Sequence, residues 1–288
     1  MTTAAELRDT AVELAREAGA LVESYAGRVG VAATKSSDVD VVTEADRAVE
    51  ERIRLWLGLS RSDDAILGEE GDDVPGTSGV RWIVDPIDGT VNFLYGLPEY
   101  SVSIAAEVDG EVVAGAVLDV AKSRLYAADT DSGVATCNGV RLGVRGPAPL
   151  GQRLVLTGFS YRAEVRAVQG AAVARMLPRV RDIRRHGSCA LELCHVAAGD
   201  ADAYVEEGVN LWDYAAGGLV ARLAGARLSV GRGAGGGDLV ICAPDHGFEE
   251  FSTLVGECGF SALDWGEYPA PTRCSATRTR PVSRPDAG

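Results

Sequence analysis

Residues 82–93 read Trp82-Ile83-Val84-Asp85-Pro86-Ile87-Asp88-Gly89-Thr90-Val91-Asn92-Phe93. The apolar run at the start predicts a buried strand, and Pro86 stiffens the turn that follows because its ring fixes φ. Asp85 and Asp88 supply the hard carboxylate oxygens that Mg²⁺ takes as ligands. Gly89 and Thr90 can begin a helix whose free N–H groups accept a phosphate. This order of residues predicts a site for a metal ion and a phosphate group.

Asp85 and Asp88 also have simpler interpretations when they are taken alone. Aspartates after strands are often turn formers or helix N-caps. An EF-hand is excluded, because the twelfth residue counted from Asp85 is Gly96, where such a loop needs a bidentate glutamate. The function of the motif therefore depends on the rest of the chain.

The composition is that of an ordinary globular protein, with 288 residues of which 46% are hydrophobic and 24% are charged. No apolar run reaches the roughly 18 residues of a membrane span, and the N-terminus lacks the features of a secretory signal. We therefore expect a cytoplasmic protein with no membrane partner. A net charge of −14 argues against nucleic acid as a partner, but not against a small phosphorylated substrate, since divalent cations invert the local field.

Cysteine and histidine usage argues against a zinc site. The chain has three histidines and six cysteines, with no Cys-x-x-Cys pair, whereas structural zinc needs such spacings. Most of the cysteines lie in apolar contexts, so we expect buried free thiols. The six are Cys137, Cys189, Cys194, Cys242, Cys258 and Cys274.

The pattern of apolar residues changes along the chain. Strand signals dominate residues 80–145, and the Gly- and Pro-rich residues 143–151 are the best internal boundary. Beyond it, strands and helices alternate, which predicts an α/β layer. Residues 231–237 are rich in glycine but lack a P-loop ending, and we expect a helix-to-strand loop there. The helices are expected at 4–27, 44–57, 163–177, 189–198, 213–224 and 249–258, and the strands of the second half at 154–157, 183–185, 203–206 and 239–242.

Three further acidic features accompany the opening motif. Glu69 and Glu70 follow a strand signal, while Asp213 and Asp46 each lie at the start of a predicted helix. Taken singly, the glutamates have a simple interpretation as solvated loop charges, and Asp213 as a helix cap. Asp46 could likewise be a first-turn acid favoured by the helix dipole.

Taken together and in order, these motifs resemble the inositol monophosphatase family of Mg²⁺-dependent, lithium-sensitive phosphatases. The resemblance runs from about residue 4 to residue 262. Two signatures in one chain make it specific, since several motifs in their expected context outweigh a single match. The matching segments are Lys35-Ser36-Ser37, the Asp46 motif, Gly68-Glu69-Glu70, Asp85-Pro86-Ile87-Asp88-Gly89-Thr90, Gly187-Ser188 and Trp212-Asp213.

The resemblance implies an α+β fold, a layered αβαβα sandwich like that of inositol monophosphatase and fructose-1,6-bisphosphatase. It further implies an N-terminal part (1–145) carrying most metal ligands, a C-terminal part (146–265) carrying Asp213 and the substrate wall, and a tail (266–288) that we expect to be disordered. Two or three Mg²⁺ ions are implied, with oxygen ligands of the kind this ion requires. The implied ligands are Glu69, Asp85, the Ile87 carbonyl, Asp88 and Asp213.

The resemblance also implies roles in catalysis. Glu69 would deprotonate a water with help from Thr90, whose hydroxyl would be held by Asp46. The implied substrate contacts are Gly89, Thr90, Gly187, Ser188, Cys189, Glu206 and Asp213. Cys189 departs from the small, alanine-like residue usual in the family, which would trim the pocket. Lys35 would either close over the site on a loop or be an ordinary solvated lysine.

The predicted reaction is the Mg²⁺-dependent hydrolysis of inositol 1-phosphate to inositol and phosphate, by a homodimer as in relatives. The residues Val91-Asn92-Phe93 resemble the inositol phosphatase branch. Histidinol phosphate, fructose 1,6-bisphosphate or another small phosphate monoester stays open as a substrate, because few pocket residues decide it. A protein that binds metal without catalysis is the alternative of another class.

Overall fold

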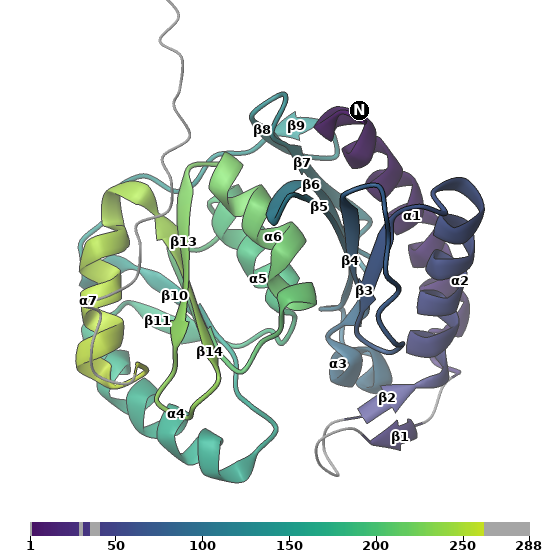
Figure 1. Ribbon diagram of the computed structural model, residues 1–288. Coiled ribbons are helices and arrows are strands. Elements are labelled where there is room, and N and C mark those ends of the chain that lie inside the picture. Colours follow the sequence, from purple (N-terminus) through teal and green to yellow (C-terminus); the bar gives the residue numbers. More distant parts are fainter. Residues whose placement is uncertain (1, 29–30, 35–40, 262–288) are drawn as a thin grey trace, which may run out of the picture.

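The computed structural model of the chain describes residues 2–28, 31–34 and 41–261, and its elements form five layers (Figure 1). A seven-stranded and a five-stranded sheet face each other with two helices between them. Two further helices cover the outer face of each sheet. This order, αβαβα, confirms the predicted α+β sandwich. Lys35 and the predicted tail at 266–288 lie outside the described residues.

In the seven-stranded sheet, β3 and β4 pair in parallel and the other neighbours pair antiparallel. In spatial order its strands are β3 (Ala65–Gly68), β4 (Val80–Asp88), β5 (Ser101–Val108), β6 (Glu111–Asp119), β7 (Arg124–Asp129), β8 (Val134–Cys137) and β9 (Val140–Arg141). Helices α1 (Ala4–Tyr25) and α2 (Glu44–Ser60) cover its outer face.

Helices α1 and α2 confirm the two helices predicted near the N-terminus. The apolar stripe of α1 is buried, from Leu7 to Val22, and a capping box of Thr3 and Glu6 begins the helix by satisfying free N–H groups. A second capping box, formed by Thr43 and Asp46, begins α2. Each helix buries one apolar face against the sheet. This burial stabilises the layer by about 25 cal/mol for each Å² of apolar surface removed from water.

In the five-stranded sheet, β10, β11 and β12 run parallel, and β13 and β14 add an antiparallel hairpin. In spatial order its strands are β11 (Asp182–Arg184), β10 (Leu154–Thr157), β12 (Ala203–Glu207), β14 (Asp238–Pro244) and β13 (Ala226–Arg232). Helices α4 (Ala163–Met176) and α7 (Phe248–Cys258) cover its outer face. Residues 231 and 232 are the last of β13, and residues 233–237 connect it to β14. The helix-to-strand loop predicted at 231–237 was therefore wrong, because β13 was not recognised.

Helices α5 (Cys189–Ala198) and α6 (Leu211–Leu223) form the middle layer and pack against both sheets. Both are buried along most of their length, as expected of helices that are apolar all round. Because this core joins the two halves, the division at residue 145 stays a prediction. No described helix has the length and apolar character to cross a membrane.

The remaining elements are short. They are β1 (Val31–Thr34), β2 (Val41–Thr43), α3 (Thr90–Tyr95) and the 3₁₀ turns η1 (Leu150–Gln152), η2 (Leu177–Arg179) and η3 (Asp245–Gly247). Five cysteines lie in the described residues; all are free and four are buried, which agrees with the prediction of free thiols. Cys274 lies outside those residues.

Candidate active site

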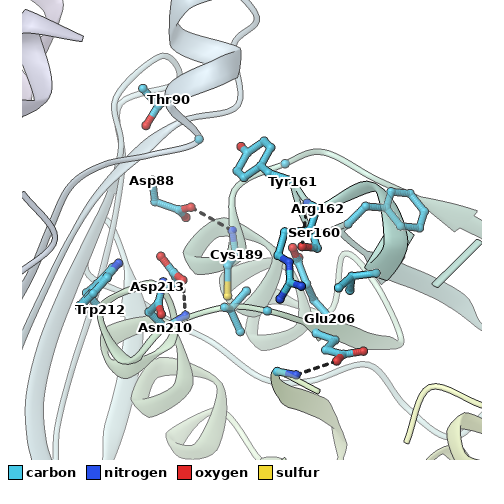
Figure 2. Close-up of a pocket in the computed structure, with 18 of the residues that line it drawn as sticks. Asp88, Thr90, Ser160, Tyr161, Arg162, Cys189, Glu206, Asn210, Trp212 and Asp213 are labelled. Carbon is cyan, nitrogen blue, oxygen red and sulfur yellow. Dashed lines mark hydrogen bonds between the residues drawn. The ribbon is translucent and has the colours of Figure 1, made fainter. Parts of the chain in front are cut away.

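A cavity of about 420 Å³ lies where β3 and β4 end and where α5 and α6 begin. Figure 2 shows Asp88, Cys189 and Asp213 on one side of it and the segment Ser160 to Arg162 on the other. Most of the site residues predicted from the sequence line this cavity. They are Glu69, Asp85, Ile87, Asp88, Gly89, Thr90, Gly187, Cys189, Glu206 and Asp213.

Glu69 and Asp85 meet because β3 and β4 are parallel neighbours. Gly68, the last residue of β3, pairs with Val84 in β4. Glu69 and Asp85 are the residues that follow this pair. They therefore lie at the same edge of the sheet, because the carboxyl ends of parallel strands meet there. The two carboxylates, distant in sequence, thus share the cavity.

Asp85 and Asp88 share the cavity because β4 is irregular between them. In a regular strand, residues three apart point to opposite faces of the sheet. Here Asp85 pairs with Ser103 and Asp88 with Ser101, so β4 uses one more residue than β5. Such a bulge shifts the alternation of side chains by one. Pro86 lies within it, where a missing N–H costs no ladder hydrogen bond.

Asp213 completes the carboxylate cluster from α6. It is the third residue of that helix, and its Oδ2 accepts a hydrogen bond of 2.5 Å from the backbone N–H of Asn210. One carboxylate oxygen each from Asp85, Asp88 and Asp213 lies within 4.8 Å of the others. Asp213 is thus both a member of a capping box and a member of the cluster.

The electrostatics of the cluster fit a divalent cation. Asp85 is 1% exposed, and its Oδ1 has no hydrogen-bond partner among the described residues. Burial, together with the charges of Glu69, Asp88 and Asp213, raises the pKa of Asp85 well above its usual value. The pKa of Asp213 is raised for the same reasons. Such a cluster is unfavourable without a counter-charge, and hard oxygen donors are what Mg²⁺ binds.

Asp88 is oriented by the N-terminus of α5. Its carboxylate accepts hydrogen bonds from Ser188 Oγ (2.5 Å), the Ala190 N–H (2.7 Å) and the Cys189 N–H (3.2 Å). Burial outweighs these bonds and raises the pKa of Asp88 to about 6. Ser188 is 1% exposed and lies behind the cavity wall, so its contact with substrate stays a prediction.

Thr90 and Asp46 are connected, as the resemblance implied. Thr90 Oγ1 lies 3.1 Å from Asp46 Oδ1 and 3.0 Å from the Ile87 carbonyl oxygen, so its proton can go to either acceptor. The other oxygen of Asp46 accepts bonds from the N–H (2.8 Å) and hydroxyl (2.5 Å) of Thr43. The capping box of α2 therefore fixes Asp46, which lies buried behind Thr90 and outside the cavity lining.

Two glycines let the backbone segments of the site approach each other. Gly89 has φ of 95°, and a Cβ there would lie 2.8 Å from the Glu99 carbonyl oxygen and 3.2 Å from that of Gly187. Gly187 has φ of 97°. L-residues with side chains rarely adopt such angles. Only glycine therefore brings the 89–90 turn against the start of α5 at this spacing.

Glu50 is a site residue that the sequence analysis missed. It is 2% exposed, and its carboxylate accepts hydrogen bonds from the N–H groups of Glu70 and Gly71, both at 2.8 Å. Arg54 Nε donates to the same carboxylate at 2.7 Å. Glu50 thereby fixes the turn that carries Glu69. The sequence did contain one indication of this role. Glu50 is a charged residue beside Val49 on the otherwise apolar face of α2.

Replacing Glu50 by alanine is expected to lower the free energy of unfolding by roughly 2–4 kcal/mol, because two partly buried N–H groups lose a charged acceptor, at the lower end of about 1–3 kcal/mol each. Activity should fall as well, since the turn at Glu69 loses its support. Urea unfolding and phosphate release measure the two effects. Glu51→Ala, exposed on the same helix, is the matched control, and equal stability of the two variants would contradict the role of Glu50.

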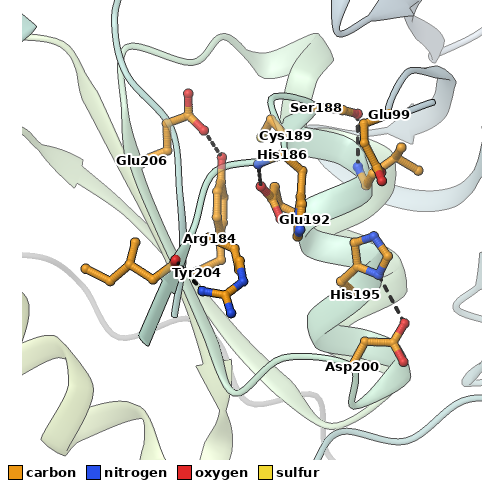
Figure 3. Close-up of polar contacts among 12 residues, drawn as sticks. Glu99, Arg184, His186, Ser188, Cys189, Glu192, His195, Asp200, Tyr204 and Glu206 are labelled. Atoms are coloured by element: carbon orange, nitrogen blue, oxygen red, sulfur yellow. Dashed lines mark hydrogen bonds and ion pairs between the residues drawn. The ribbon is translucent and has the colours of Figure 1, made fainter. Parts of the chain in front are cut away.

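The turn at residues 186–188 is held from two sides. Asn92 Nδ2 donates to the carbonyl oxygens of Glu99 and His186, both at 2.7 Å. Glu192 accepts from the His186 backbone N–H at 2.9 Å and lies 3.0 Å from Nδ1 of its ring (Figure 3). The bond with Glu192 raises the pKa of His186. None of these contacts was predicted, because each depends on how two loops and the start of α5 pack together, and the bond from Asn92 to His186 joins residues that are 94 positions apart.

Glu206 and Glu207, at the end of β12, have different surroundings: Glu206 faces the cavity and Glu207 binds the glycine-rich loop. Glu206 lines the cavity, accepts a 2.9 Å hydrogen bond from the Tyr204 hydroxyl (Figure 3), and has a pKa raised to about 7 by burial. Glu207 is 2% exposed and accepts from the N–H groups of Gly235 (3.0 Å) and Gly237 (2.9 Å). Glu207 therefore fixes the glycine-rich loop that forms part of the cavity wall.

The model of the inositol monophosphatase family matches residues 3–250. The chain belongs to the inositol monophosphatase family. Members of this family are phosphatases, so a small phosphorylated substrate is supported.

Individual relatives agree with this membership. Inositol-1-monophosphatase SuhB of Mycobacterium tuberculosis is 45% identical over 266 residues, which cover 83% of this chain and 89% of the relative. Nus factor SuhB of Haemophilus influenzae is 36% identical over 255 residues, covering 86% and 95%. The solved structure of Mycobacterium tuberculosis SuhB matches with a TM-score of 0.77 and 42% identity, covering 90% of this chain and 99% of that one.

Proposed function

We propose that the chain hydrolyses inositol monophosphate, with inositol 1-phosphate as its substrate and Mg²⁺ as its cofactor. The observation that carries the proposal is the convergence of Asp85, Asp88 and Asp213 at the edge of a cavity in an inositol monophosphatase family member. One oxygen of Asp85 there has no hydrogen-bond partner among the described residues. Relatives named inositol-1-monophosphatase support the substrate.

The metal ligands in this proposal are oxygen atoms. Glu69, Asp85, Asp88, Asp213 and the Ile87 carbonyl would hold two or three Mg²⁺ ions. When bound, these ions would supply positive charge that neutralises the phosphate and its transition state. Lithium sensitivity and a homodimer stay predictions that accompany this assignment.

The chain's own groups would orient the reaction. Glu69 would accept a proton from the attacking water, and Thr90 would orient that water through a hydroxyl fixed between Asp46 and the Ile87 carbonyl. The N–H groups of Gly89 and Thr90 would donate to the non-bridging phosphate oxygens, where charge increases during transfer. Glu206 would accept hydrogen bonds from the polyol hydroxyls on the opposite wall.

A substrate panel with a Glu206 variant tests this proposal. Purified protein in Mg²⁺ is offered inositol 1-phosphate, histidinol phosphate and fructose 1,6-bisphosphate, and kcat/KM is measured for each. We expect inositol 1-phosphate to be preferred. Glu206→Gln should raise KM for it about tenfold with little change in kcat, because a residue that contacts only the polyol contributes uniform binding.

Two results would contradict the substrate assignment. One is a higher kcat/KM for either of the other esters in the unmodified protein. The other is an unchanged KM for inositol 1-phosphate in Glu206→Gln. Neither result would affect the phosphatase chemistry, which rests on the carboxylate cluster.

A further inference from the structure

Arg185 is a cation of the cavity wall with no fixed partner among the described residues. Of those residues, two arginines line the cavity, Arg162 and Arg185. Arg162 is bound to Glu164, with a 2.7 Å hydrogen bond from Nε and an ion pair of 2.5 Å. Arg185 makes neither a hydrogen bond nor an ion pair with any described residue. Its guanidinium is therefore available to a bound molecule.

The guanidinium of Arg185 lies over Gly187. A Cβ added to Gly187 would overlap that guanidinium, with Cζ only 3.1 Å away. Gly187 in turn borders Gly89, the residue before Thr90, at the predicted phosphate position. Arg185 is thereby placed beside the junction of the 89–90 turn and the start of α5.

Arg185 also acts on Glu206 across the cavity wall. Its positive charge lowers the pKa of the Glu206 carboxyl, although burial has the larger and opposite effect. The two side chains form no ion pair in the structure, and Glu206 is bound by the Tyr204 hydroxyl through one oxygen. The Arg185 guanidinium and the Glu206 carboxyl group thus line the same cavity without forming a direct ion pair.

We propose that Arg185 and Glu206 together select a neutral polyol phosphate and reject substrates with an ammonium group close to the phosphate ester. A hydroxyl can donate to the Glu206 carboxylate and accept from the Arg185 guanidinium at the same time. An ammonium group has three donors and no acceptor, so it gains only from Glu206 and is repelled by Arg185. This inference rests on the proposed function and names the class of substrate that the same site excludes.

Two small esters of equal size test the proposal. Glycerol 1-phosphate and serinol phosphate differ only in a hydroxyl or an ammonium group on the carbon next to the ester carbon. The unmodified protein in Mg²⁺ should show a kcat/KM at least about tenfold higher for the glycerol ester, equivalent to about 1.4 kcal/mol. Equal values for the two esters would overturn the proposal without any variant.

Variants of Arg185 locate the cause of this preference. Arg185→Gln should reduce the preference about tenfold by removing the charge, and Arg185→Lys should retain most of it. The matched control is Arg184→Gln, because Arg184 is outside the cavity lining and bonds to the Ile183 carbonyl oxygen at 2.9 Å. A parallel loss for both esters in Arg185→Gln, with an unchanged ratio, would show that Arg185 binds phosphate and would overturn the selection role.

The same assays separate this proposal from the proposed function. Failure to release phosphate from inositol 1-phosphate would contradict the proposed function. Turnover of inositol 1-phosphate with no discrimination between the glycerol and serinol esters would contradict the role of Arg185 alone. Thermal unfolding of each variant reports whether it is folded, and the exposed position of Arg185 predicts little change in Tm.

Discussion

Asp85→Asn is expected to lower kcat at least about 10³-fold while raising the Tm of the metal-free protein. The loss of activity follows because stabilisation of a phosphoryl transition state by bound metal is worth several kcal/mol, and each 1.36 kcal/mol is a factor of ten in rate. The gain in stability follows because Asp85 is buried beside three other carboxylates, which raise its pKa.

The sign of the stability effect depends on pH. A carboxyl whose pKa is raised in the folded state contributes stability that is present below the unfolded pKa, near 3.8, and is lost as the pH rises through the folded pKa. At neutral pH the metal-free protein therefore carries the cost of either ionising or protonating the buried Asp85 carboxyl, and asparagine removes it. Added Mg²⁺ should stabilise the unmodified protein more than the variant.

Phosphate release and thermal unfolding, each with Mg²⁺ and with chelator, measure these effects. Asp109→Asn is the matched control, because Asp109 is exposed in a hairpin turn at φ of 52°, which asparagine tolerates. Full activity of Asp85→Asn would rule out a metal role for this carboxylate. A lower Tm of the metal-free variant would contradict the electrostatic argument.

Glu69→Gln is expected to lower kcat about 10²–10⁴-fold, the range associated with loss of a general base. Glutamine keeps the size of the side chain and the turn held by Glu50, so the free energy of unfolding should change little. Glu70→Gln, at the neighbouring position outside the cavity lining, should retain most activity. Both variants are assayed by phosphate release over a range of pH and of Mg²⁺ concentration.

The Mg²⁺ series separates two roles of Glu69. If Glu69 served only to bind metal, a high Mg²⁺ concentration would restore the activity of Glu69→Gln. A role in proton transfer predicts instead a persistent loss at saturating Mg²⁺, with a weaker dependence of kcat on pH. Activity equal to that of Glu70→Gln would contradict both roles.

Local patterns in the sequence predicted the outer helices and much of the site. The period of apolar residues identified α1 and α2, since one face of each is buried on the sheet. The motifs at Asp85, Asp88 and Asp213 identified residues that the structure brings within 4.8 Å. The helix predictions succeeded because each depends on residues close together in sequence. The three carboxylates were recognised from signatures shared with the family, and their roles stay predictions.

The geometry that assembles the site was not visible in the sequence. The bulge after Asp85 reverses the usual alternation of side chains. Pro86 indicated an interruption, which the sequence analysis interpreted as a turn after the strand, whereas β4 continues through it to Asp88. Strand β13 was missed because its inner residues are only partly buried, which weakens the apolar signal. Glu50 and Glu207 were missed because their carboxylates bind backbone N–H groups about 20–30 residues away.

Phosphate release from inositol 1-phosphate by the unmodified protein is the measurement that tests the metal-dependent phosphatase most directly. It is carried out with Mg²⁺, then after removal of metal by chelator and gel filtration, and again after Mg²⁺ is restored. The carboxylate cluster predicts turnover in the first state, loss of turnover in the second and recovery in the third. Turnover that persists in the metal-free protein, or a folded protein that releases no phosphate with Mg²⁺, would contradict it.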